Sequence, residues 1–154
     1  MALITLNKLA LPTGNVIQVK SAFLNLTAVN TSSTSFVATG LSVSITPSST
    51  SNKIFLSLQG GAMYNTTTAS VSQKVTIYRD STNIGDSTHG LSRFSTPGGT
   101  WSIAPHACSV LDSPSSTSSL LYHVYFRRED TSASVQFSSG DRGRVTLTAY
   151  EIVG

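Results

Sequence analysis

The stretch that decides the fold covers residues 108–128 and reads CSVLDSPSSTSSLLYHVYFRR. Its pattern predicts a strand, a Ser-rich loop and a second strand. Side chains of the second strand alternate between two mostly apolar sets, Leu120, Tyr122, Val124 and Phe126 on one face and Leu121, His123 and Tyr125 on the other. A strand that is apolar on both faces is typically buried on both. We therefore expect the first set to meet a second sheet, and Leu121, His123 and Tyr125 to meet a partner subunit.

Composition favours a single all-β domain. The 154 residues suffice for one core, and only 11% of them are charged. Thr suits strands and Ser suits turns, and both recur throughout the chain. Short alternating runs separated by turn residues predict about eight to ten antiparallel strands in a sandwich or barrel, and no βαβ pattern indicates a parallel sheet.

Charge and cysteine content bear on partners and compartment. The net charge is +3, with ten basic residues spread along the chain, which argues against a nucleic-acid binder. No apolar run approaches the length of a transmembrane helix, so we expect no membrane insertion. Residues 1–14 lack the pattern of a signal peptide. Cys108 is the only cysteine, which excludes an intrachain disulfide and suits assembly in a reducing cytoplasm.

Residues 1–13 are expected to form an N-terminal arm, and residues 14–154 one sandwich domain. The arm is apolar but irregular, and its candidate anchoring residues are Leu3, Ile4, Leu6, Leu9 and Leu11. A frayed first strand is the alternative interpretation of the same residues.

Within the sandwich, five local features lead to specific expectations. Phe23 is expected in the core, Gly40 is expected to interrupt a strand, and Gly60-Gly61 to end one. Pro105 is expected to bend its strand or to place it at a sheet edge, because proline cannot donate to a strand ladder. The turn TPSSTS at 46–51 recurs as SPSSTS at 113–118, and each precedes a strand. The repeat indicates either two equivalent corners of one sandwich or a coincidence of Ser-rich turns.

No constellation of residues points to catalysis or to a metal. His89, His106 and His123 lie in no metal-binding pair, and no Gly-x-Ser-x-Gly motif supports a Ser/His/Asp triad. The carboxylates lie mostly in expected turns, without the pairing that a glycosidase needs. No calcium loop occurs. We therefore expect no catalytic residue, cofactor or metal ion, and a buried or interface role for His123.

Four arginines come from neighbouring strand and turn ends: Arg127, Arg128, Arg142 and Arg144. They form either a solvated rim or one basic spot that contacts an acidic surface such as an anionic glycan or a capsid shell. Asn25, Asn30 and Asn65 fit the glycosylation pattern, which we interpret as accidental in a Thr-rich chain without a secretory signal.

Five stretches occur together in one order: STSFVATGLSVSITP at 33–47, Lys53-Ile54 after a Ser-rich turn, IYRDSTNIG at 77–85, LDSPSSTS at 111–118 and VTLTAYEI at 145–152. This order resembles a widespread group of tailed-phage virion proteins, abundant in cyanophages, that are described as tail-fibre or structural proteins. The resemblance covers roughly residues 14–154. It implies a trimeric jelly-roll sandwich related in shape to tumour-necrosis-factor-type heads, located in the virion and assembled in the host cytoplasm.

The resemblance implies a non-enzymatic protein whose partners are its own copies and other virion proteins, from the tail or the major capsid shell. As an exposed appendage it would contact host surface glycans through polar loops, with Asn65, Thr66, Thr67, Arg93 and Trp101 as candidate contacts. The sequence shows no shaft repeats before the sandwich, which leaves a capsid decoration protein anchored by residues 1–11 as the alternative. A glycan hydrolase is the third hypothesis, and an assay on host polysaccharide would distinguish it.

Overall fold

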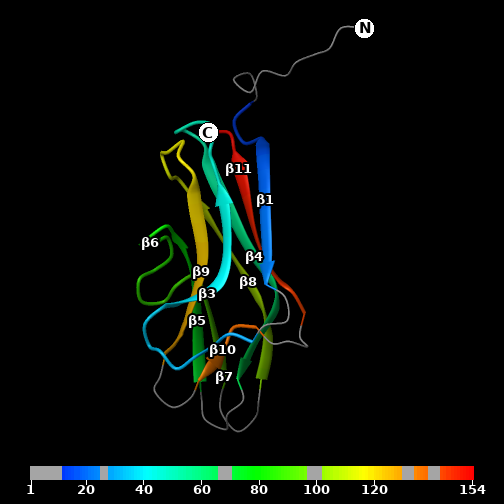
Figure 1. Cartoon of the computed structure of the whole chain (residues 1–154), viewed down its shortest axis with the longest axis vertical. Coiled ribbons are helices and arrows are strands. Elements are labelled where there is room, and N and C mark those ends of the chain that lie inside the picture. Colours follow the sequence, from blue (N-terminus) through cyan, green and yellow to red (C-terminus); the bar gives the residue numbers. More distant parts are fainter. Residues whose placement is uncertain (1–11, 25–27, 66–70, 97–101, 130–133, 139–142) are drawn as a thin grey trace, which may run out of the picture.

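Alternation of apolar and hydroxyl side chains gives the chain its strands, and two antiparallel sheets pack face to face (Figure 1). The structure is a computed structural model that describes residues 12–24, 28–65, 71–96, 102–129, 134–138 and 143–154. The described residues form strands and connecting turns only. They include eight strands of five or more residues and three strands of two residues.

Sheet A contains, in spatial order, β1 (Val16–Leu24), β11 (Val145–Ile152), β4 (Lys53–Asn65) and β8 (Ser102–Asp112). The two-residue strands β10 (Val135–Gln136) and β2 (Asn30–Thr31) continue this sheet from the end of β4. Sheet B contains β3 (Val37–Ile45), β9 (Leu120–Arg128) and β5 (Val71–Arg79), and the free edge of β5 pairs with β6 (Thr82–Asn83) and β7 (Ser92–Thr96).

The order of the long strands defines the fold. From one long strand to the next, the chain crosses between sheets at every step except between β5 and β7, which form a hairpin-like pair in sheet B. The result is β1-β11-β4-β8 facing β3-β9-β5-β7, the strand arrangement of a jelly roll. The expected all-β jelly-roll sandwich is confirmed, with eight long strands in the described part of the chain.

The core lies between the sheets and is filled by the inward member of each alternating pair. On β9 every second side chain is buried, and the same holds on β11. The largest fully buried apolar side chains are Tyr122, Phe126, Phe137, Leu41, Ile45, Ile54, Leu56, Leu58, Ile77 and Leu147. Burial of this set is the main stabilising term, at roughly 1.5–3 kcal/mol for each large side chain.

Three sequence expectations were wrong in detail. Phe23 is 52% exposed rather than buried, because it is an outward residue of β1 whose ring lies under the guanidinium of Arg144. Gly40 does not interrupt β3, and Gly60 does not end β4. Both glycines have positive φ and lie where the pairing register shifts, so each is a β-bulge within a continuous strand. Pro105 does lie on an edge strand, since β8 pairs only with β4.

The repeated Ser-rich turns are the two corners through which the chain changes sheet. Residues 46–52 connect β3 to β4 and residues 113–119 connect β8 to β9, at the same end of the sandwich (Figure 1). Buried Glu151 organises the first corner: its Oε1 accepts hydrogen bonds from Ser48 N at 2.6 Å and from Asn52 Nδ2 at 2.6 Å. Interpreting the repeat as two corners of one sandwich fits this geometry.

Candidate interaction surfaces

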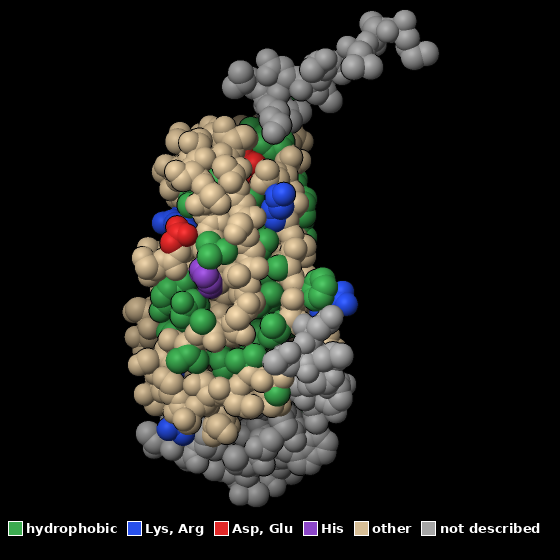
Figure 2. Space-filling view, viewed as in Figure 1, with side chains coloured by type: hydrophobic (Ala, Val, Ile, Leu, Met, Phe, Trp, Pro, Cys, Tyr) green, Lys and Arg blue, Asp and Glu red, His purple; other side chains and the backbone are tan. Residues whose placement is uncertain are grey.

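The predicted interface residues Leu121, His123 and Tyr125 all point away from the core on β9 and are half-buried. Neighbouring side chains of sheet B cover them in part: the ring centroids of Tyr125 and Tyr78 are 4.2 Å apart, and those of Tyr125 and His123 are 6.2 Å apart. In the view of Figure 1, hydrophobic side chains gather in several patches on this side of the molecule, one of them beside a histidine (Figure 2). The role of Leu121, His123 and Tyr125 in an interface stays a prediction.

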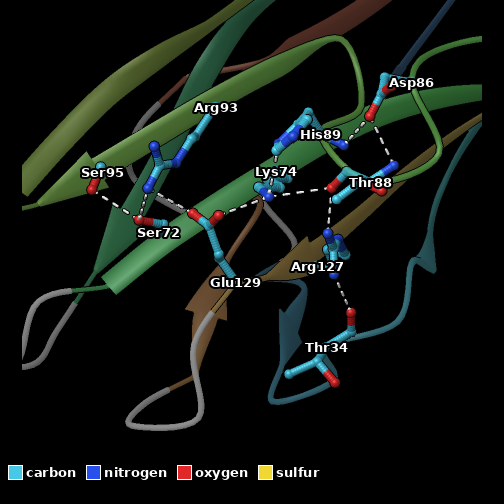
Figure 3. A network of polar contacts seen from close by, with 10 residues as sticks. All are labelled: Thr34, Ser72, Lys74, Asp86, Thr88, His89, Arg93, Ser95, Arg127 and Glu129. Atoms are coloured by element: carbon cyan, nitrogen blue, oxygen red, sulfur yellow. Dashed lines mark hydrogen bonds and ion pairs between the residues drawn. The ribbon is translucent and has the colours of Figure 1, made fainter.

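Farther along the outer face of sheet B, a polar network surrounds a buried lysine (Figure 3). The side chain of Lys74 on β5 is 2% exposed, although it points away from the core. The connection from β6 to β7 covers it: Lys74 Nζ donates to Thr88 O at 3.2 Å and lies 3.3 Å from His89 Nδ1. An ammonium group donates only, so Nδ1 of His89 is the acceptor in this contact.

The charge of Lys74 is balanced by Glu129, which follows β9. Glu129 Oε1 lies 2.8 Å from Lys74 Nζ, and its Oε2 lies 2.7 Å from Arg93 Nη2 (Figure 3). The hydrogen bond from Lys74 lowers the pKa of Glu129, and the charges of Lys74 and Arg93 lower it further. The network therefore fixes β7 and the β6–β7 connection to the sheet. Sequence patterns alone gave no sign of it, since Lys74 lies at an outward position of an ordinary strand.

The same connection is capped by a carboxylate. Asp86 Oδ1 accepts hydrogen bonds from the backbone of His89 at 2.5 Å and of Thr88 at 2.8 Å. These two bonds, that of His89 first, lower the pKa of Asp86. The turn is thus built around one exposed aspartate, the role that sequence patterns assign to turn carboxylates.

Arg127 joins this network from β9 and borders a shallow hollow. Its Nη1 donates to Thr34 O at 2.6 Å, its Nη2 donates to Thr88 O, and its guanidinium lies 5.0 Å from the centre of the Phe36 ring. The hollow has a volume of about 280 Å³ and is lined mainly by polar residues, among them Ser35 and Ser87 from the two segments that Arg127 bridges. Arg127 therefore acts first as a tie between residues 34–36 and 87–88.

Of the two alternatives for the arginines, a solvated rim or one basic spot, the structure does not place Arg127 and Arg144 in one spot. Arg127 lies on the outer face of sheet B, while Arg144 stacks at 3.9 Å on Phe23 at the outer face of sheet A. Arg128 lies beside Arg127 in sequence, with its backbone N donating to Ser33 O at 3.0 Å. Arg142 lies outside the described residues. Arg127 and Arg144 therefore lie on the outer faces of opposite sheets.

Most predicted host-contact and anchor residues lie outside the described part of the chain: Thr66, Thr67, Trp101, Leu3, Ile4, Leu6, Leu9 and Leu11. For Asn65 the backbone alone is described, as the last residue of β4. Arg93 lies on β7 with its side chain 54% exposed, although one edge of it pairs with Glu129. Asn65, the last residue of β4, pairs with Ser102, the first of β8, and Thr96, the last of β7, pairs with Val71, the first of β5. These strand ends lie at the end of the sandwich opposite the two corners.

A charged clamp ties the two sheets together near the corners. Arg79 on β5 donates through Nη1 to both oxygens of Asp112 on β8, at 2.8 Å each. Tyr122 on β9 donates its hydroxyl to Asp112 Oδ2 at 2.7 Å. Burial, followed by this hydrogen bond, raises the pKa of Tyr122 well above its usual value. Asp112 thus joins β5 and β9 of sheet B to β8 of sheet A.

Two further titratable groups face the interior from β8. His106 is 2% exposed and donates from Nε2 to the carbonyl of Phe137, and burial lowers its pKa to about 4. Burial raises the pKa of the Cys108 thiol to about 11. Both side chains are neutral at physiological pH, which suits packing roles. Among the described residues, no three His, Cys, Asp or Glu side chains lie close enough to hold a metal ion.

The outer face of sheet A is the most apolar exposed surface of the described structure. The five large hydrophobic side chains that are exposed all belong to β1 or β8 of this sheet: Val16, Val19, Phe23, Ile103 and Leu111. The sequence did not predict this surface. Alternation shows that Leu111 and its neighbours in the chain lie on opposite faces of the strand, but it does not show which face is exposed to solvent. The described chain has no helix that is long and apolar enough to span a membrane.

No protein-family model matches the chain, and no curated protein matches its sequence. Among solved structures, one of the infectious bursal disease virus Gx strain is 15% identical with a TM-score of 0.36, and the match covers 100% of this chain and 43% of that chain. The VP2 subviral particle of the same virus is 14% identical with a TM-score of 0.36, covering 100% and 42%. The chain thus spans less than half the length of these proteins. The jelly-roll assignment rests on the chain's own strand order.

Proposed function

We propose that this chain is a non-enzymatic structural protein of a phage virion, where it forms a surface-exposed trimeric appendage of the tail-fibre or receptor-binding-head type. The observation that carries the proposal is the apolar outer face of sheet A. An exposed apolar patch of this kind marks an interaction site, and the subunit of an assembly has such a face where it meets its neighbours. We propose a phage virion as that assembly because the sequence resembles tailed-phage virion proteins.

The polarity of the sandwich supports a role as an appendage. Gly14 N donates to Val153 O at 2.8 Å, so the described chain begins beside its C-terminal strand at the corner end. The strand ends that flank residues 66–70 and 97–101 in the sequence lie at the opposite end: β4 and β7 end there, and β5 and β8 begin there. An arm at one end can attach to the particle while polar loops at the other contact host surface glycans.

Loop exchange tests host contact. Residues 66–70 and 97–101 are replaced together by the loops of a related protein from a phage of another host. We expect adsorption to the original host to fall, because the exchanged loops contain Thr66, Thr67 and Trp101. Unchanged adsorption by particles that incorporate the exchanged protein would contradict host contact through these loops.

The alternative is a capsid decoration protein, and the apolar arm favours it. Leu3, Ile4, Leu6, Leu9 and Leu11 would insert into a groove of the major capsid protein at the corner end of the sandwich. Deleting residues 1–11 should then release the protein from purified heads without unfolding the sandwich, because the described strands begin only at Val16.

Immunogold labelling of intact particles with antibody to this protein distinguishes the two placements. Gold at the tail supports the host-contact appendage, and gold over the head supports decoration. Purified particles without label, in a preparation where the antibody detects the free protein, would contradict both and remove the virion proposal.

A further inference from the structure

Outward apolar side chains on sheet A are ordered into a row that crosses its four long strands. The pairing register aligns Val19 with Tyr150, Tyr150 with Phe55, and Phe55 with Leu111. Val19 and Leu111, at the two ends of the row, are 53% and 50% exposed. The rings of Phe55 and Tyr150 in the middle lie 6.0 Å apart, centre to centre, and are half-buried. The row thus forms a continuous apolar ridge over four strands.

Beside the ridge runs a trough of small hydroxyl side chains. One step along each strand on the same face, Ser21 is aligned with Thr148, Thr148 with Ser57, and Ser57 with Ser109. Rows on one face of a sheet are separated by roughly 7 Å, two residues of strand. Between β4 and β8 the trough deepens into a depression of about 390 Å³, bordered by Phe55 and Ala107. Large and small rows therefore alternate at a spacing that suits interdigitation.

Charge is nearly absent from this face. Lys53 on β4 and Arg144 before β11 border this face. Lys20 on β1 pairs with Ala149 of the inward set, and the carboxylates of Asp112 and Glu151 point inward. A second copy placed on the face therefore brings no charges together at its centre. Depletion of charge with aromatic enrichment is typical of the centre of interfaces between identical subunits.

Coverage distinguishes the two sheets. The outer face of sheet B is already covered in part by its own chain, since the β6–β7 connection buries Lys74 and Thr76. On sheet A the ends of the ridge remain half exposed. The four strands span about 30 Å by 19 Å, or roughly 570 Å² in projection, from the standard rise and strand spacing. With side-chain relief, this approaches the roughly 800 Å² per partner of a stable interface.

We propose that the occupant of this face is a second copy of the same chain, and that copies associate through the outer face of sheet A with Leu111, Phe55, Tyr150 and Val19 at the contact. The inference rests on the self-association proposed above, without its threefold symmetry, and names the surface through which copies meet. It differs from the interface predicted at Leu121, His123 and Tyr125, which lies on the opposite sheet.

Two leucines form a matched pair for the test, because each is an outward residue of a long strand and the two lie on opposite sheets. The full chain is compared with Leu111→Glu and Leu121→Glu by sedimentation velocity across the micromolar range. Val19→Glu is a second variant on sheet A, at its other edge. The side chains of Leu111 and Val19 lie outside the core, so we expect far-UV circular dichroism to be unchanged in both sheet A variants.

We expect the unmodified chain to be oligomeric, and Leu111→Glu and Val19→Glu to weaken association by about a hundredfold or more, since each places an unpaired charge in an apolar contact. Leu121→Glu should associate like the unmodified chain. Dissociation by Leu121→Glu alone would overturn the sheet A interface and leave the oligomer standing. A monomeric unmodified chain throughout the concentration range would overturn both the interface and the proposed trimer.

Discussion

The ammonium of Lys74 lies 2.8 Å from the carboxylate of Glu129, although the lysine side chain is only 2% exposed and the glutamate side chain is 32% exposed. The lysine is buried by the β6–β7 connection and the glutamate is reached by solvent and by Arg93. Removing either partner therefore has different consequences. Loss of the glutamate leaves a buried cation without its counter-charge, whereas loss of the lysine leaves a carboxylate that keeps another partner.

Glu129→Gln is expected to destabilise the fold more than Lys74→Met. The first change should lower the free energy of unfolding by about 2 kcal/mol, less than for a fully buried pair because the glutamate is partly solvated. The second should cost about 1 kcal/mol or less, since an apolar side chain fills the same space. Urea unfolding of both variants at one protein concentration measures the difference, and equal losses would contradict this asymmetry.

Acid sensitivity is expected from His106. Its pKa is about 4 in the folded chain against 6.5 without burial, so the unfolded chain binds a proton that the folded chain excludes. The stability that neutral His106 contributes is complete above pH 6.5 and is lost as the pH falls toward 4. The pKa difference corresponds to about 3 kcal/mol at most.

The variant His106→Gln isolates this effect, because the glutamine amide does not titrate and can still donate to the Phe137 carbonyl. Urea unfolding of both chains between pH 7 and pH 4.5 should show a steeper decline for the unmodified chain. Parallel pH profiles would place the acid sensitivity in other groups, such as Glu129 and Asp86, whose pKa values are lowered.

Cys108 is expected to be almost inert in the folded chain. Burial raises its pKa to about 11, so the reactive thiolate is scarce at neutral pH and the sulfur is poorly accessible. Alkylation by iodoacetamide at pH 8 should be many times slower in buffer than in denaturing urea, where the single cysteine reacts freely. A native rate near the denatured rate would show that β8 opens readily from the sheet.

Alternation in the sequence was sufficient to predict the strands and much of the core. Leu41, Val43 and Ile45 alternate with small hydroxyl residues, and all three are buried as expected. Alternation also places Leu121 and Tyr125 opposite the core on β9. Such local patterns are reliable because the side chains of a strand can face only two ways.

What the sequence could not predict depends on pairing between distant segments. Phe23 is a large apolar residue of the kind usually found in a core. Only its position opposite Thr146, on the outer face of sheet A, shows that it is exposed. The apolar ridge becomes visible only when four strands are aligned, because Val19 and Leu111 are separated by most of the chain. Burial of Lys74 requires the β6–β7 connection to fold back over β5, which no local pattern signals.

The sequence expectations for Gly40 and Gly60 were also wrong, and the two glycines allow a matched test of strand continuity. Gly60 has φ of +84° and Gly40 has φ of +85°, so an alanine at either site meets similar backbone strain of about 1 kcal/mol. Their surroundings differ. A Cβ at position 60 would lie 2.5 Å from the carbonyl oxygen of Arg144, whereas a Cβ at position 40 would have no atom within 4 Å.

Gly40→Ala is therefore expected to lower the free energy of unfolding by about 1 kcal/mol, and Gly60→Ala by about 3 kcal/mol, because the second must also push β4 away from β11. Urea unfolding of the two variants under identical conditions gives the comparison. Since Arg144 continues into β11, the displacement should also speed amide hydrogen exchange at Val145, which is paired with Gly60. Equal destabilisation by the two variants, with hydrogen exchange at Val145 unchanged, would contradict this prediction. It would mean that the β4 bulge can move away from the Arg144 carbonyl, and that β4 and β11 are held less tightly there than their pairing indicates.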